Sequence, residues 1–262
     1  MKIDVYTHFL PPVYFEALHK KTKCDLAKMA PYAERPILRQ IELMRRAMDR
    51  FPDVMAVLTV ASPPLEDVVS PSDAVELAKM ANDELCAIVD KYPDKFIAGV
   101  ACLPLSDVDA AIREADRTIT ELHFRGVQIF TNIGGEPVDV PRLRPLYERM
   151  VQHDLPIWIH PWYSPIMGSP SIANDFPKVV QDWVPPASRN AFGWAFETSV
   201  AMLRLVHAGV FQDYPTIKFI THCGQGQVAR SLDVGGHLAD EPLDGLEGRD
   251  RFAKLYPFGG IV

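Results

Sequence analysis

The chain has few cysteines and no excess of positive charge. Its four cysteines are Cys24, Cys86, Cys102 and Cys223, and no two of them have a CxxC spacing. This usage predicts reduced thiols. Lysine and arginine number 27 against 34 aspartates and glutamates, which gives a net charge of −7. A general nucleic-acid or anionic-membrane surface needs basic patches, so we expect neither kind of partner.

Long hydrophobic runs are also missing. No apolar stretch approaches the ~18 residues that a membrane span requires. Met1-Lys2 leads directly into a predicted strand, without the apolar core or cleavage site of a secretory signal, so we expect a cytoplasmic protein. The sequence has no Gly-x-Ser-x-Gly motif, and Gly224-Gln225-Gly226-Gln227 lacks the Lys-Ser/Thr of a P-loop. Serine-hydrolase and P-loop chemistry are therefore unsupported.

Apolar segments instead alternate with amphipathic segments along most of the 262 residues. This alternation predicts βαβ units around a parallel sheet, and hence an α/β fold. The predicted strands are Ile3–His8, Val54–Val60, Phe96–Leu103, Gly126–Phe130, Pro156–His160 and Ile217–His222. Nothing resembles a linker between domains, so residues 1–262 are expected to form one domain.

Two helices and one long connection stand out between the strands. Apolar spacing predicts a helix over Ile37–Phe51, and Ser70-Pro71-Ser72-Asp73 is an N-cap signal for a helix that runs to about Lys91. Residues 161–190 form a loop or lid excursion rich in proline and aromatic residues. Loops of this length usually carry function. A wall over a pocket and an oligomer contact both fit its composition.

Three of the predicted strands end in a histidine. These residues are His8, His160 and His222. In a (β/α) barrel the active site lies at the C-terminal ends of the parallel strands, which is where these imidazoles are expected. Three histidines at equivalent places favour a shared metal or proton-transfer site. The alternative is three unrelated histidines, each bonded to a nearby backbone group.

Four segments are specific enough to compare with a known family. They are Ile3-Asp4-Val5-Tyr6-Thr7-His8-Phe9-Leu10-Pro11, Pro156-Ile157-Trp158-Ile159-His160-Pro161-Trp162, Gly193-Trp194-Ala195-Phe196-Glu197-Thr198, and the run from Phe211 to Gly224. In this order they resemble the metal-dependent amidohydrolase superfamily. The resemblance is strongest to the amidohydrolase 2 branch, which contains aminocarboxymuconate-semialdehyde decarboxylase and related aromatic-acid decarboxylases.

The resemblance implies a TIM-type, distorted (β/α)₈ barrel with a divalent metal at its C-terminal face. Zinc is the usual ion, and manganese is the alternative. His8 and His160 would be metal ligands, and His222 would be the acid/base. Neutral imidazole suits such an ion, and a histidine that titrates near neutral pH can pass a proton. A homodimer is also expected.

The resemblance further suggests four substrate-binding residues. Tyr6 lies on the same face of its strand as His8, at a ligand position of the family. Trp162 is a candidate wall of the pocket. Trp194 matches the helix that borders the pocket, where core packing explains it equally well. Arg230 could clamp a substrate carboxylate, because a guanidinium binds that anion through two hydrogen bonds.

The chain departs from the family pattern in two places. Tyr6 stands where most members have the first histidine of HxH, and a neutral phenol is a poor ligand. Two further strands and a ligand aspartate are expected after His222, but the remaining sequence offers no candidate for them. We therefore expect a barrel that lacks its last two strands in this chain.

The function that follows is non-oxidative decarboxylation of a small aromatic or muconate-type carboxylic acid. A metal-dependent hydrolase or hydratase of the same superfamily is an alternative within enzymes. A non-catalytic relative with a degraded metal site is the alternative outside them. Tyr6 and the missing aspartate favour that last reading, whereas His160 and His222 oppose it.

Overall fold

The computed structural model of the chain describes residues 2–22, 24–162 and 194–222. One parallel sheet contains β1 (Lys2–Phe9), β2 (Val54–Val60) and β3 (Phe96–Gly99), in that order. A second contains β4 (Ala101–Cys102), β5 (Val127–Phe130), β8 (Ile157–His160) and β9 (Phe219–Thr221). The predicted α/β class with parallel strands is confirmed, and each predicted strand is present.

The two sheets are continuous at the junction of β3 and β4. The Val100 N–H donates to the Leu58 carbonyl of β2, and the next N–H, of Ala101, donates to the Gly126 carbonyl before β5. The extended run from 96 to 102 therefore pairs with β2 through its first half and with β5 through its second. Six parallel strands follow one another across the described part of the chain.

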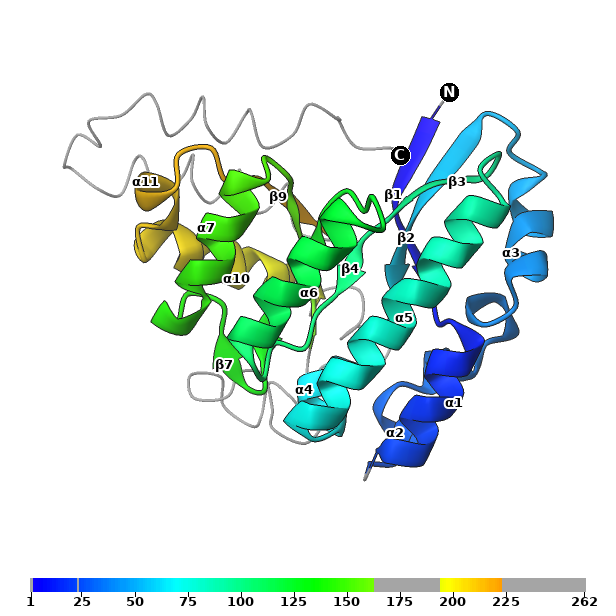
Figure 1. Cartoon of the computed structure of the whole chain (residues 1–262), viewed down its shortest axis with the longest axis horizontal. Helices are drawn as coiled ribbons and strands as arrows, with labels where there is room; N and C mark the ends of the chain where they lie inside the picture. The colour runs from blue at the N-terminus through cyan, green and yellow to red at the C-terminus, as the bar shows by residue number, and fades with distance from the viewer. Residues whose placement is uncertain (1, 23, 163–193, 223–262) are drawn as a thin grey trace.

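Helices connect the strands and cover one side of the sheet. In Figure 1, α5, α6 and α7 lie side by side in front of the strands. The helices are α1 (Pro12–Lys21), α2 (Leu26–Met29), α3 (Ile41–Met48), α4 (Leu65–Val68), α5 (Pro71–Lys91), α6 (Val108–Thr120), α7 (Arg144–Gln152), α10 (Trp194–His207) and α11 (Val210–Asp213). Short 3₁₀ turns span Pro31–Glu34, Pro36–Leu38 and Pro141–Leu143, and β6 (Asn132–Ile133) pairs with β7 (Glu136–Pro137) as a hairpin.

Local sequence signals explain where the main helices begin. The Ser70 hydroxyl accepts a hydrogen bond from the Asp73 N–H at 3.2 Å, and Pro71 occupies the first turn of α5. The predicted cap is confirmed, and α5 ends at Lys91 as expected. Asp107 caps α6 in the same way, through the Ala110 N–H at 2.9 Å. Such caps satisfy N–H groups that have no partner within the helix.

The helix predicted over Ile37–Phe51 is wrong in its first part. A 3₁₀ turn ends at Leu38, Gln40 is extended (φ −115°, ψ 98°), and α3 begins only at Ile41. The Leu38 carbonyl accepts a hydrogen bond from the Leu10 N–H at 2.6 Å. This tertiary contact uses a carbonyl that a continuous helix would need for its own ladder.

Apolar side chains form two layers, one on each side of the sheet. The larger layer lies between the strands and the helices and includes Phe9, Leu58 and Ile129. The smaller layer consists of Val57, Ala98, Val100 and Trp158, with Ile3, Tyr6 and Ile220 packed against it. Its members come from strands at both ends of the strand order, so this layer fills the inner face of a curved sheet.

The curvature can be judged from two histidines on the outermost strands. In a flat sheet, six strands spaced by about 4.8 Å would place the first and last about 24 Å apart. His8 at the end of β1 and His222 after β9 instead approach to 3.2 Å between their Nε2 atoms. The sheet must therefore curl until its two edges face each other at their C-terminal ends.

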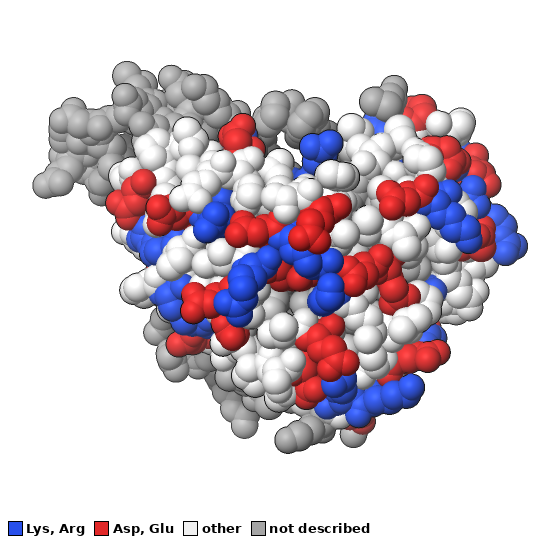
Figure 2. Space-filling model, viewed as in Figure 1, with Lys and Arg blue, Asp and Glu red and all other residues white. Residues whose placement is uncertain are grey.

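Charged side chains of both signs are interspersed over the helical face (Figure 2). Arg117 of α6, for example, contacts Glu114 at 2.7 Å and Asp83 of α5 at 2.8 Å. Arg117 and Glu114 are mostly shielded from solvent, whereas Asp83 is exposed. The face is a mixed, solvated surface. Among the described residues, no helix combines the length and the apolar character needed to cross a bilayer.

Gly126 makes room for the largest side chain of the inner layer. A Cβ at this position would lie 2.3 Å from the Pro156 carbonyl oxygen and 2.4 Å from the Trp158 ring. Neither group can move easily, because one belongs to the backbone and Trp158 is only 3% exposed.

Replacing Gly126 with alanine should lower the free energy of unfolding by about 2 kcal/mol, since the added methyl overpacks a closed space and alanine rarely adopts the φ of 157° found here. Urea denaturation measures this change. Gly134→Ala is the control: its Cβ would meet nothing nearer than the Glu66 Cβ at 3.9 Å, and only its positive φ of 58° is strained. Equal losses for the two variants would contradict the steric explanation.

Candidate metal and acid–base site

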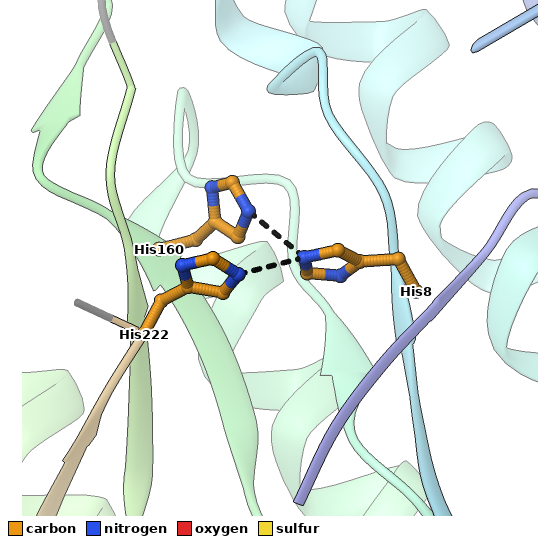
Figure 3. Close-up of side chains that lie close together, drawn as sticks. All are labelled: His8, His160 and His222. Atoms are coloured by element: carbon orange, nitrogen blue, oxygen red, sulfur yellow. Dashed lines mark hydrogen bonds between the residues drawn. The ribbon is translucent and has the colours of Figure 1, made fainter. Parts of the chain in front are cut away.

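The histidines of three separate strands converge at one point (Figure 3). The His8 Nε2 lies 3.2 Å from the Nε2 of His160 and 3.2 Å from the Nε2 of His222. Their rings are close as well, with centroids separated by 4.7 to 5.1 Å. The fold therefore brings the three histidines together at the C-terminal ends of β1, β8 and β9.

Backbone geometry fixes which nitrogen His160 presents. Its Nδ1 lies 2.7 Å from the carbonyl oxygen of Pro161. A carbonyl can only accept, so Nδ1 carries the proton and Nε2 keeps its lone pair. His160 is 4% exposed, and this hydrogen bond holds its ring toward His8.

A buried hydroxyl orients His8. The His8 Nδ1 lies 2.9 Å from the hydroxyl oxygen of Thr59, which is fully buried on β2 directly opposite His8 in the strand register. When Nδ1–H donates to this hydroxyl, the Nε2 lone pair points toward the other two histidines.

Burial favours the uncharged form of all three rings. It is the largest cause that lowers the pKa of His8 to about 4, and the charge of His222 lowers it further. Burial, followed by His8 and His222, also lowers the pKa of His160. Burial lowers the pKa of His222 as well, against an opposing effect of the Asp4 carboxylate. At neutral pH the site therefore presents neutral imidazoles, the form that binds metals.

The spacing of the nitrogens fits a single divalent ion. Two nitrogens bound about 2.0–2.1 Å from a tetrahedral zinc lie about 3.3 Å apart. The 3.2 Å between the Nε2 atoms of His8 and His160 matches that span. His8 and His160 could therefore hold a metal from one side.

Two predicted substrate-binding residues border the histidines. The Tyr6 ring lies edge-on to the His222 ring with centroids 4.8 Å apart, and lies 5.6 Å from His8. Trp194, in the first turn of α10, has its ring centroid 6.1 Å from His222 and 6.3 Å from His160. Both therefore contribute aromatic surface beside the candidate site.

Trp162 does not border the histidines directly. The Trp162 indole N–H donates to Asp67 at 2.7 Å, and the ring packs 6.3 Å from Phe130, whose own ring is 5.3 Å from His160. Trp162 is thus buried behind Phe130 with its polar atom already bonded. Arg230 lies outside the described residues, as do residues 163–190 of the predicted loop or lid.

The comparison with protein families fits this geometry. The model of a family described as Amidohydrolase matches residues 3–243. The chain belongs to this family. Within it, the chain is similar to two curated decarboxylases. It is 32% identical over 156 residues to 2-amino-3-carboxymuconate-6-semialdehyde decarboxylase of Dictyostelium discoideum. The aligned region covers 60% of this chain and 40% of that protein.

A second relative is gamma-resorcylate decarboxylase of Rhodococcus jostii (strain RHA1), 32% identical over 193 residues, or 69% of this chain and 55% of that protein. The chain spans about half the length of these curated relatives. A similar solved structure is 5-carboxyvanillate decarboxylase of Novosphingobium aromaticivorans, complexed with manganese and 4-hydroxy-3-methoxy-5-nitrobenzoic acid. The two structures superpose with a TM-score of 0.69 at 25% sequence identity. The superposition covers 90% of this chain and 70% of that one.

Sequence reasoning missed the residues that orient the histidines of this amidohydrolase. Thr59 is one of them, and its signal was available as a polar residue near the end of the apolar strand Val54–Val60. Asp67 was missed as well, and it accepts the hydrogen bond of the Trp162 indole behind Phe130. Nothing in the local sequence marks Asp67, since its partner is distant along the chain.

Glu66 is a further missed residue, beside a small cavity at the C-terminal ends of β2, β4 and β5. The cavity has a volume of about 10 Å³, and Glu66, Cys102 and Gln128 are among its lining residues. The Leu105 N–H donates to Glu66 Oε1 at 2.6 Å. Burial nevertheless dominates and raises the pKa of Glu66 to about 7.

The Glu66 carboxyl should make stability depend on pH. Between about 4.5 and 7 the folded protein holds a proton on Glu66 that the unfolded chain has released, so the free energy of unfolding falls as pH rises. Relative to Glu66→Gln, the wild type should lose about 2 kcal/mol between about pH 5 and pH 8. Urea denaturation across this range measures it, with the exposed Glu16→Gln as control. Parallel pH profiles for wild type and Glu66→Gln would contradict the prediction.

Proposed function

We propose that this amidohydrolase is a metal-dependent, non-oxidative decarboxylase of a small aromatic or muconate-type carboxylic acid. The convergence of the His8 and His160 Nε2 atoms, 3.2 Å apart, carries the proposal. The similarity to decarboxylases of such acids supports the reaction class. We also propose that the fold is a TIM-type barrel. Six of its strands lie in the described residues.

His8 and His160 would hold the ion. We propose zinc, with manganese as the alternative, because manganese is bound in the 5-carboxyvanillate decarboxylase structure. Such an ion, when bound, supplies positive charge that stabilises negative charge on the oxygens of the substrate. The Nε2 atoms of His8 and His160 would bind it, because the Pro161 carbonyl engages Nδ1 of His160 and the Thr59 hydroxyl lies 2.9 Å from Nδ1 of His8.

His222 would act as the acid/base through its Nε2. In decarboxylation, the carbon that bears the carboxylate accepts a proton, and the bond to the carboxyl carbon then breaks as CO₂ departs. The electron pair of that bond returns to the substrate, so charge and atoms balance. His222 follows β9 directly, and its Nε2 faces the same point as those of His8 and His160. General acid catalysis requires such a positioned group, and because burial favours the neutral form of His222, it would take up a proton from solvent before each transfer.

Aromatic surface would hold the substrate against this donor. Tyr6 and Trp194 border His222 and are proposed to contact the substrate. Trp162 would stiffen the wall behind Phe130, and Arg230 would pair with the carboxylate. We also propose that the protein is cytoplasmic and forms a homodimer.

Metal content tests the first step. After incubation with Zn²⁺ or Mn²⁺ and desalting, the wild type should carry close to one ion per chain by elemental mass spectrometry. His8→Ala and His160→Ala should each carry essentially none, since one imidazole alone holds a divalent ion weakly. His207→Ala, an exposed histidine near the end of α10, is the control. A wild type without metal would exclude the metal mechanism and favour a non-catalytic relative.

His222 is tested by separating metal binding from turnover. With 2,6-dihydroxybenzoate as a trial substrate, His222→Asn should lower kcat for CO₂ release by at least about 100-fold, because a positioned acid/base contributes that much. Its metal content should match the wild type. Turnover by His222→Asn at the wild-type rate would exclude the acid/base role. Water addition to a substrate, without CO₂ release, would instead indicate a hydratase or hydrolase.

A further inference from the structure

Strand β1 contains a β-bulge just before the histidine. Asp4 pairs with Ala56 of β2, and the next paired residue, Thr7, lies opposite Leu58. Two residues of β1, Val5 and Tyr6, therefore oppose a single residue of β2. An extra residue of this kind shifts the alternation of side chains between the two faces of a strand.

This shift decides which way His8 points. Ile3 packs into the inner apolar layer, and on a regular strand the residues that share its face would be Val5, Thr7 and Phe9. In the structure Tyr6 packs on the inner layer, whereas Phe9 is fully buried in the outer one. Without the bulge, an inward Ile3 would require His8 to face the helices, away from His160 and His222.

The carboxylate of Asp4 stabilises the bulge from one side. Its Oδ1 accepts a hydrogen bond from the Tyr6 N–H at 2.9 Å, and its Oδ2 accepts one from the Thr7 hydroxyl at 2.8 Å. One side chain thus binds Tyr6, the second residue of the bulge, and Thr7, which follows it. A short-range turn of this type is typical of aspartate.

The indole of Trp158 holds the bulge from the other side. Its Nε1–H donates to the Val5 carbonyl at 2.8 Å, from strand β8 across the inner face. Trp158 precedes His160 by two residues on that strand. The bulge is therefore bonded to the same strand that supplies the other proposed metal ligand.

We propose that Asp4 is a positioning residue, whose two hydrogen bonds maintain the bulge that turns Tyr6 and His8 toward the histidine cluster. The importance of this orientation for metal binding rests on the proposed function. Asp4 is itself exposed and acts through β1. Its charge also influences His8 and His222, so hydrogen bonding and charge have to be tested separately.

Three variants of the full chain separate the two effects. Asp4→Ala removes both hydrogen bonds and the charge. Asp4→Asn removes the charge but keeps an oxygen that can accept from the Tyr6 N–H. Thr7→Val removes only the bond to Oδ2. Asp53→Ala is the matched control, because it removes a surface carboxylate that pairs with Lys2 of β1 at 3.1 Å.

Mn²⁺ affinity by titration calorimetry is the first measurement. Asp4→Ala should bind at least about 10-fold more weakly, the effect expected when a group that orients a ligand is lost. Asp4→Asn and Asp53→Ala should stay close to wild type, and Thr7→Val should fall between. If Asp4→Ala is too unstable to purify, a weakening in Thr7→Val supports the proposal and wild-type affinity there overturns it.

NMR contacts between the Tyr6 and His222 rings are the second measurement, and they need no metal. The wild type should show nuclear Overhauser effects between these rings, and Asp4→Ala should lose them while Asp4→Asn keeps them. Unchanged contacts in Asp4→Ala, or equal loss in Asp4→Ala and Asp4→Asn, would overturn the proposal. A wild type that binds no Mn²⁺ would count against the proposed function, and the ring contacts would still decide the role of Asp4.

Discussion

The site depends on the contact between the two edges of the curled sheet. His8 belongs to the first strand and His222 to the end of the last described one, yet their Nε2 atoms are 3.2 Å apart. Four intervening strands must turn the chain through a closed arc to allow this. The inner apolar layer around Trp158 fills the space that the curled sheet encloses. The curvature of the sheet therefore produces both the packing of this layer and the approach of the histidines.

Burial then sets the chemistry of the assembled rings. Three imidazoles held together in a dry environment cannot all be charged, and the pKa of His8 falls to about 4 for this reason. Thr59 and the Pro161 carbonyl occupy the nitrogens that face outward. The Nε2 atoms of His8, His160 and His222 converge on one point, an arrangement suited to a cation.

Much of this arrangement could be predicted from the sequence, because its signals are local. Apolar runs show where His8, His160 and His222 end their strands, and parallel strands present those ends at one edge. The bulge could not be predicted, since Asp4 and Thr7 look like ordinary strand residues until the pairing with β2 is known. The bond from Trp158 to Val5 and the late start of the helix predicted over Ile37–Phe51 likewise arise from partners that are distant in sequence.

The two proposed metal ligands differ in how their orientation can be lost. His160 is oriented by a backbone carbonyl, and every amino acid at position 161 would supply that acceptor. His8 is oriented by the Thr59 side chain, which one nucleotide change can replace. The β8 side of the site is therefore tolerant of mutation, whereas the β1 side is fragile. Natural variation or laboratory evolution that alters ion binding should accumulate around β1.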